Sequence, residues 1–170
     1  HGNELMDYQR IKKQSAENLI QDAGFEERSP HWKNLNAGGW KIVSGAGRNG
    51  SSGLVNTRKN PNDYVLLQQE FKLKPDTAYV FGGWIRTEKL SGRGASLCIE
   101  WSNARTGKWL GGSYIGDVSG TNDWQEVKGK FVAKGYPDPV RCHISFYVRK
   151  GSRGSVAFDD VYVRPDSAEW

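Results

Sequence analysis

Short alternating or apolar segments, separated by turns rich in Gly, Asn, Asp and Pro, recur along most of this chain. No amphipathic helical pattern lies between them. About ten such segments at regular spacing predict an all-β fold, an antiparallel β-sandwich. The clearest strands are expected at 39–43, 64–72, 77–87, 95–101, 109–115, 124–132, 140–148 and 156–163.

Glycine and proline content supports this prediction. The 170 residues include 21 Gly and 6 Pro, and 12% are aromatic, which favours strands joined by tight turns over a helical bundle. The length suits one domain with a substantial core. Because no run of about 18 apolar residues occurs, we expect no membrane partner.

The formal net charge is +5, but Lys and Arg are spread along the chain. Neither a basic helix nor the aromatic-basic pattern of an RNA-binding strand is present, so we expect no nucleic-acid partner. The charge indicates a solvated surface, with binding of anionic glycans as the alternative interpretation.

The composition changes near residue 18. Residues 1–17 are polar and are expected to form a linker or N-terminal extension. From 18 to 26, a short apolar strand runs into a glycine turn followed by an aromatic residue and a carboxylate. We therefore expect one domain at 18–165 and a C-terminal tail at 166–170.

Residues 77–87 show the most informative alternation. One row of side chains consists of Tyr79, Phe81, Gly83 and Ile85. The opposite row consists of Val80, Gly82, Trp84 and Arg86. The first row is apolar enough to face a core, whereas the second sets a flat indole and a guanidinium beside a glycine. This second row indicates a sugar-binding platform, unless Trp84 only covers an edge of the sandwich.

Four short motifs follow one another in a fixed order. They are Asn-Leu-Ile-x-Asp-x-Gly-Phe-Glu at 18–26, Gln-x-Phe-x-Leu-Lys-Pro-x-Thr-x-Tyr at 69–79, Thr-Asn-Asp-Trp-Gln at 121–125 and Phe-Asp-Asp-Val-Tyr-Val at 158–163. In this order they resemble the carbohydrate-binding modules of families 4, 9, 16 and 22. The resemblance implies a β-jelly roll that binds polysaccharide and is attached to a glycoside hydrolase. It leaves the glycan open, because such modules bind xylan, β-glucans, mannan, cellulose and other glycans.

A module of this kind implies an open groove, in which sugar rings pack on aromatic side chains and hydroxyls meet polar or charged groups. Alternation along the neighbouring strands places Glu100, His143 and Tyr147 on the groove face. The expected ligand-binding constellation is therefore Trp84, Arg86, Glu100, His143 and Tyr147. The alternatives are an Arg86–Glu100 ion pair on a solvated face and a hydrogen-bonded surface His143.

The remaining aromatic residues are assigned by context. Positions that carry core aromatics in the resembling modules correspond to Trp40 and Trp124. Two aromatics in or beside loops, Trp109 and Tyr114, are added to the expected ligand-binding set. Whether Trp32 and Tyr64 also join the groove, or pack under their own loops, stays open.

In the resembling modules, a structural Ca²⁺ ties the N-terminal strand to the C-terminal one. Its ligands there are a Gly-Phe-Glu carboxylate, a late Asp and backbone carbonyls. Glu26 matches the first position, and Asp159 or Asp160 matches the second, because alternation does not decide which of two adjacent residues faces the ion. Oxygen donors of this kind are what Ca²⁺ requires. The alternative is that these carboxylates are simply solvated.

The two cysteines, Cys98 and Cys142, fall on opposite faces of their expected strands. This predicts two free thiols, even in a secreted protein. A disulfide between them is the alternative.

The sequence thus favours a secreted, monomeric, non-catalytic module that keeps an attached catalytic domain near polysaccharide. A structural spacer without ligand is one alternative, and exposure of Trp84 and Tyr147 on one concave surface would argue against it. A copper-dependent oxidative enzyme, with His1 and either His31 or His143 as ligands, is a remote alternative. Neither a convincing acid/base carboxylate pair nor a hydrolase motif supports hydrolysis.

Overall fold

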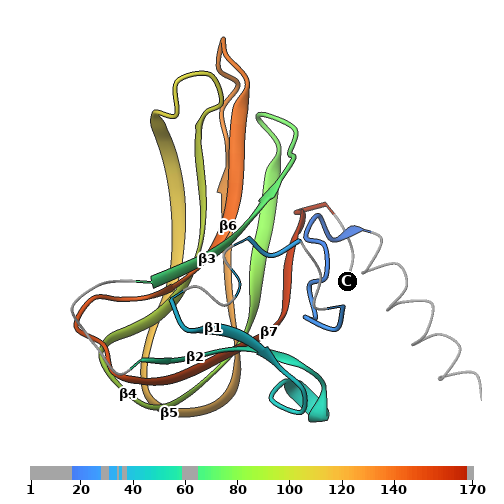
Figure 1. Ribbon diagram of the computed structural model, residues 1–170. Helices are drawn as coiled ribbons and strands as arrows, with labels where there is room; N and C mark the ends of the chain where they lie inside the picture. The colour runs from blue at the N-terminus through green and yellow to red at the C-terminus, as the bar shows by residue number, and fades with distance from the viewer. Residues whose placement is uncertain (1–16, 28–30, 34, 36–37, 59–64, 168–170) are drawn as a thin grey trace, which may run out of the picture.

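A computed structural model describes residues 17–27, 31–33, 35, 38–58 and 65–167 (Figure 1). The strands are β1 (Trp40–Val43), β2 (Gly53–Arg58), β3 (Val65–Phe71), β4 (Ala78–Asn103), β5 (Trp109–Val132), β6 (Val140–Val148) and β7 (Gly154–Pro165), and a 3-10 turn, η1, spans Arg48–Gly50. Every strand pair is antiparallel. The all-β antiparallel prediction is therefore confirmed.

The sheet order is β1-β2-β7-β4-β6-β3, with β5 along β4. Strands β4 and β5 form one long ribbon whose pairing runs from Ala78↔Val132 to Ser102↔Trp109. The first half of β4 borders β7, and the second half borders β6. Register shifts between Thr87 and Ala95 bend the ribbon between these halves, beside the β4 and β5 labels in Figure 1.

The bend divides the sheet into two layers that face each other. Layer A contains β1, β2, β7 and the ribbon residues 78–88 and 122–132; layer B contains β3, β6 and the ribbon residues 95–103 and 109–118. The ring of Phe146 in β6 lies 4.8 Å from that of Phe158 in β7 and 6.3 Å from that of Trp40 in β1. Since these rings come from opposite layers, the core lies between the layers, as in a β-sandwich.

The inward row predicted at 79, 81, 83 and 85 is buried, as is Trp40. Trp124 is only partly buried, so its assignment to the core is wrong. It lies on β5, which pairs only with β4 among the described residues. Because β5 is an edge strand, no further described strand lies beside Trp124 to shield it from solvent. Trp32 is 3% exposed and packs on Phe25 at 5.0 Å, so it belongs to the core and not to a groove. Tyr64 lies outside the described residues.

Two further strand expectations differ from the structure. Strand β2 was not expected, because Asn56 faces inward and interrupts the apolar alternation. Asn56 is 1% exposed, and its side-chain amide donates to the Gly38 carbonyl at 3.0 Å. Residues 18–26 form turns and not a strand, and they join β7 through bonds from Leu19 N to Val163 O and from Val161 N to Ala23 O.

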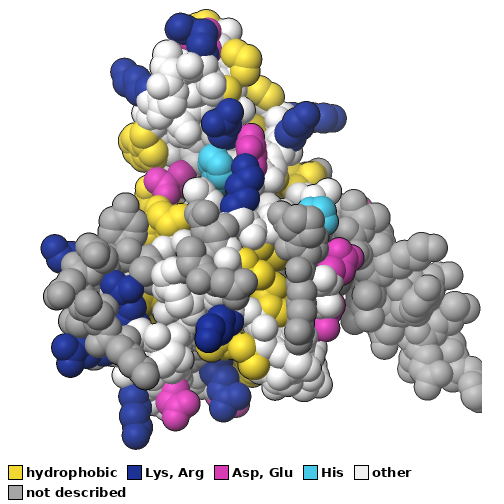
Figure 2. Space-filling model, viewed as in Figure 1, with side chains coloured by type: hydrophobic (Ala, Val, Ile, Leu, Met, Phe, Trp, Pro, Cys, Tyr) yellow, Lys and Arg dark blue, Asp and Glu magenta, His cyan; other side chains and the backbone are white. Residues whose placement is uncertain are grey.

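Lys and Arg side chains are scattered over the face seen in Figure 2, with acidic side chains among them. This distribution agrees with a solvated charged surface on that face. No described segment forms a helix with the length and hydrophobicity needed to cross a membrane.

Candidate functional site

The outer surface of layer B carries an aromatic cluster organised by one carboxylate, Glu100. The Tyr147 hydroxyl donates to Glu100 Oε1 at 2.6 Å. The Tyr114 hydroxyl and the Trp109 indole N–H both donate to Glu100 Oε2, at 2.8 and 3.1 Å. We call these four residues the Glu100 cluster. Because hydrogen bonds to a charged acceptor are strong and directional, the carboxylate fixes the orientation of all three rings.

Two rings of this cluster are open to solvent. Trp109 is 57% exposed and Tyr114 is 47% exposed, although both are tethered by hydrogen bonds. Gly112 lies opposite Glu100 in the strand register. A Cβ at this position would lie 3.0 Å from the Tyr114 ring and hydroxyl, so the absent side chain allows Tyr114 to lean over to Glu100.

The protonation states suit hydrogen bonding to a neutral ligand. Burial, followed by the hydrogen bond to Glu100, raises the pKa of Tyr114 to about 12. The same two causes raise the pKa of Tyr147, so both phenols stay protonated donors at neutral pH. His143 lies opposite Glu100 on β6, and burial lowers its pKa. A neutral imidazole can both donate and accept a hydrogen bond.

Trp84 and Arg86 lie on the outer surface of layer A, away from this cluster. Trp84 pairs in register with Asp159 of β7 and Glu126 of β5, and the Arg48 guanidinium lies 3.8 Å above its ring. The prediction that Trp84 and Arg86 join Glu100, His143 and Tyr147 is wrong, because the bend places the two halves of β4 in different layers. A ligand-binding role for either residue on its own face stays a prediction.

Beside the Glu100 cluster, layer B contains a hollow of about 390 Å³. It is lined by Arg93, Ser96, Tyr114, Ile115, Gly116, Asp117 and Arg149. The charged residues of this group were not predicted from the sequence. Arg93 and Asp117 lie in glycine-flanked segments that read as turns, and only the ribbon bend brings them together with Arg149.

A family model, carbohydrate binding domain (CBM_4_9), matches residues 17–153. The chain belongs to this family. No curated protein matches it. Family 16 Carbohydrate Binding Module-2 is similar in structure at 18% sequence identity, with a TM-score of 0.66, over 86% of this chain and 99% of that chain. This likeness, together with the two-layer sheet, confirms the jelly roll.

Two further solved structures of similar fold contain oligosaccharides. The CBM22-1–GH10 modules of Clostridium thermocellum xylanase 10B, complexed with xylohexaose, match at 21% identity and a TM-score of 0.64, over 90% of this module and 30% of that chain. TmCBM61 in complex with β-1,4-galactotriose matches at 21% identity and a TM-score of 0.55, over 88% of this module and 99% of that chain. At these identities the likeness concerns the fold alone.

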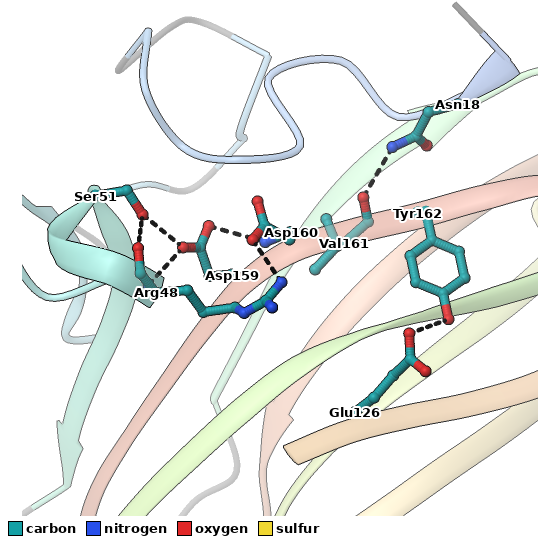
Figure 3. Close-up of polar contacts among 8 residues, drawn as sticks. All are labelled: Asn18, Arg48, Ser51, Glu126, Asp159, Asp160, Val161 and Tyr162. Carbon is teal, nitrogen blue, oxygen red and sulfur yellow. Dashed lines mark hydrogen bonds and ion pairs between the residues drawn. The ribbon is translucent and has the colours of Figure 1, made fainter. Parts of the chain in front are cut away.

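Two of the three residues expected to bind a metal ion, Asp159 and Asp160, lie beside the loop that contains η1 (Figure 3). Asp159 is fully buried; its Oδ2 accepts from Arg48 N at 2.8 Å and from Ser51 Oγ at 2.9 Å. Asp160 pairs with the Arg48 guanidinium at 2.9 Å. Glu26 Oε1 accepts from Ser52 N at 2.9 Å. One loop therefore contacts all three carboxylates.

The chemistry of this group fits a calcium ion in the module. Among the described residues, Asp159 receives hydrogen bonds only from neutral donors, and burial raises its pKa. A buried carboxylate without a cationic donor is a group that a bound cation stabilises. No cluster of three or more His, Cys, Asp or Glu side chains suited to a metal occurs among the described residues, so carbonyl oxygens would have to complete the shell. Glu26 and Asp159 would hold the ion, whereas Asp160 is engaged by Arg48; the site stays a prediction.

Proposed function

We propose that this module binds a β-linked polysaccharide of the glucan, xylan or mannan class along the outer surface of layer B. The observation that carries the proposal is the pair of exposed rings, Trp109 and Tyr114, both hydrogen-bonded to Glu100. Exposed aromatic rings held in a fixed orientation suit stacking with the C–H faces of sugars. Because their orientation is already set, little conformational entropy is lost when a ligand binds.

Hydrogen bonding to sugar hydroxyls would come from the same surface. A carboxylate can accept about four hydrogen bonds. Glu100 receives three from the rings and a long one, at 3.7 Å, from the Cys98 thiol, so a sugar hydroxyl would compete only with this weak thiol donor. The neutral imidazole of His143, opposite Glu100, offers a further partner. Stacking from two rings and hydrogen bonds from Glu100 and His143 thus serve one ligand on one face.

The biological role that we propose is targeting. A non-catalytic module of this kind, secreted together with a glycoside hydrolase in the same chain, would raise the effective concentration of the enzyme at its substrate. The C. thermocellum xylanase 10B structure, in which such a module and a GH10 module occur together, supports this arrangement. A ligand-free spacer is the competing function. Trp84 and Tyr147 do not share a surface, so the case against the spacer depends on Trp109 and Tyr114.

Affinity electrophoresis against xylan, mixed-linkage β-glucan, glucomannan and galactan tests the proposal. Trp109→Ala and Tyr114→Ala should each weaken binding to the preferred polymer by roughly tenfold or more, the effect expected of a binding hot spot. Both rings are exposed, so the melting temperature should change little. Trp84→Ala is the matched control on layer A and should retain binding.

Two outcomes would contradict the proposal. If the wild-type module binds none of these polymers, the spacer function is correct. If Trp84→Ala loses binding while Trp109→Ala and Tyr114→Ala retain it, the ligand lies on layer A, where the sequence placed the platform.

A further inference from the structure

The hollow beside the Glu100 cluster combines two cations with one anion. Arg93 donates to Asp117 Oδ2 through Nη2 at 2.8 Å, and Arg149 donates to Asp117 Oδ1 through Nε at 2.9 Å. Burial raises the pKa of Asp117, but hydrogen bonds from Arg93 and Arg149 outweigh it, and the pKa is lowered overall. Asp117 therefore stays ionised at neutral pH, and the three groups together carry a net positive charge.

Asp117 fixes these arginines without using up their donors. The side chain of Arg149 makes its hydrogen bond to Asp117 through Nε, and its two terminal amino groups have no acceptor among the described residues. Its guanidinium lies 5.4 Å from the Tyr147 ring, so the charge stands next to the Glu100 cluster. A planar guanidinium with two neighbouring N–H donors suits an anion with two oxygens.

An unpartnered hydroxyl also lines the hollow. Ser96 is 1% exposed, and its Oγ has no hydrogen-bond partner within the described part of the chain. Leaving a buried polar group unpaired is unfavourable, so such groups are rare and call for an explanation. Ser96 and Arg149 line the same hollow, so a ligand oxygen bound there is a candidate acceptor for this hydroxyl.

Tyr114 connects the hollow to the glycan surface, because it lines the hollow and donates to Glu100. We propose that the hollow binds a carboxylate substituent of the polysaccharide, such as that of a uronic acid, carried on or next to the sugar that stacks on Tyr114. This inference rests on the proposed function and narrows its ligand to an acidic glycan. It gives a local reason for part of the net positive charge of the chain.

Binding to glucuronoxylan and to the same polymer after carboxyl reduction tests the inference. The wild-type module should bind the native polymer roughly tenfold to a hundredfold more tightly, the range expected for hydrogen bonds to a charged group. The preference should weaken as salt rises. Arg149→Gln should remove most of the preference while leaving affinity for the reduced polymer within about twofold.

Two further variants separate a ligand contact from a structural role. Ser96→Ala removes a hydroxyl that makes no hydrogen bond to any described residue, so it should lower the preference for the native polymer without lowering the melting temperature. Arg93→Gln should lower the preference, whereas Arg105→Gln should not. Arg105 is the matched control, because the two arginines are similarly exposed and each is paired with an aspartate. The Arg105 side chain is 69% exposed and pairs with Asp138, and the Arg93 side chain is 68% exposed and pairs with Asp117.

The outcomes distinguish this inference from the proposed function. Equal binding to the native and the carboxyl-reduced polymer would overturn the inference and leave the proposed function unchanged. If the module bound neither of these polymers and no neutral polymer, both the inference and the proposed function would be overturned. A preference for dextran sulfate over dextran, without preference for glucuronoxylan, would overturn the carboxylate assignment. Loss of preference in Arg105→Gln equal to that in Arg93→Gln would indicate diffuse charge and no site.

Discussion

At the scale of single residues, the carboxylate of Glu100 has the largest effect on the surface that we propose to be functional. It accepts from one indole and two phenols, each on a strand neighbouring its own. None of these rings is fully buried, so packing alone does not fix their orientation. The hydrogen bonds to Glu100 therefore determine whether the surface presents ordered or mobile aromatic rings.

Removing this acceptor should weaken glycan binding without unfolding the module. We expect Glu100→Ala to reduce affinity about tenfold, because three ring donors lose their common partner. Glu100→Gln keeps one acceptor oxygen and should lose less. Isothermal titration calorimetry with the preferred polysaccharide measures both. Glu70→Gln is the control, since Glu70 lies on the same surface, opposite His143, and has no hydrogen bond to an aromatic ring of the described residues. Equal losses of affinity in Glu100→Gln and Glu70→Gln would show that the charge alone matters.

The thiols give a second test at this scale. Cys98 of β4 pairs in register with Ser145, and Cys142 of β6 pairs with Trp101. Because Trp101 is three positions after Cys98 on β4, the two thiols lie on opposite faces of the sheet, as the sequence predicts. Both are free and buried, and burial raises the pKa of Cys142 to about 12. Ellman's reagent should therefore detect no thiol in the native module and two after denaturation without reductant. Detecting none after denaturation would mean that a disulfide had formed and that the β4–β6 register is different.

At the scale of elements, the β4–β5 ribbon determines what lies on each surface. Its bulges between Thr87 and Ala95 move the chain from layer A to layer B. Gly94 in this bend has φ +88°, and a Cβ there would collide with the Val118 carbonyl oxygen. Gly120, on the facing strand, has a similar φ of +82°, but a Cβ there would meet nothing within 4 Å.

These two glycines provide a matched pair for testing the bend. Gly120→Ala should lower the free energy of unfolding by about 1–2 kcal/mol, the cost of a left-handed backbone for a residue with a Cβ. Gly94→Ala adds the collision with Val118 and should lower it by about 3 kcal/mol or more. Urea denaturation of both variants measures the difference. Equal losses would show that the bend tolerates a methyl group and that its geometry is not set by this contact.

Strand alternation predicted side-chain direction well within each uninterrupted strand segment. It correctly placed Phe81 and Ile85 inward, and it placed Glu100 and Tyr147 together on one outer surface. It did not reveal the ribbon bend, because odd-numbered residues face inward on both sides of it, while the bulges turn β4 from one layer to the other. Trp84 was therefore grouped with residues of the other layer. The hollow could not be predicted from alternation for the same reason, since the ribbon bend brings its residues together.

At the scale of the whole molecule, the N-terminal segment is held by few backbone bonds. Residues 17–27 join β7 through Leu19 and Ala23, while Glu26 reaches the η1 loop through Ser52. Gly24 lies beside two of the acidic side chains, since a Cβ there would lie 3.5 Å from Asp160 Oδ1 and 3.8 Å from Glu26 Cγ. A calcium ion at this point would connect the first segment of the domain to its last strand.

Chelation should therefore destabilise the module. An ion bound only by the folded state, at a free concentration about a hundredfold above its Kd, contributes about 2.7 kcal/mol. For a domain of this size that corresponds to a fall of roughly 5–10 °C in Tm. Differential scanning calorimetry of metal-loaded protein with and without EDTA measures it, and Asp159→Asn should respond little. An unchanged Tm in protein first shown to contain calcium would argue against the site.

The tight turn at the tip of the β4–β5 ribbon also has a consequence for the order of folding. Asn103 N donates to Lys108 O, and the Asn103 side chain accepts from the N–H groups of Arg105 and Thr106, so this turn closes with local contacts. Loop closure is least unfavourable for short loops, so the ribbon should zip from this tip toward Ala78 and Val132. In stopped-flow experiments, we expect Asn103→Ala to slow folding and Val127→Ala mainly to speed unfolding. The reverse pattern would show that pairing does not begin at this turn. On this order, the strands that carry Glu100, Trp109 and Tyr114 pair before the layer A half of the ribbon has formed.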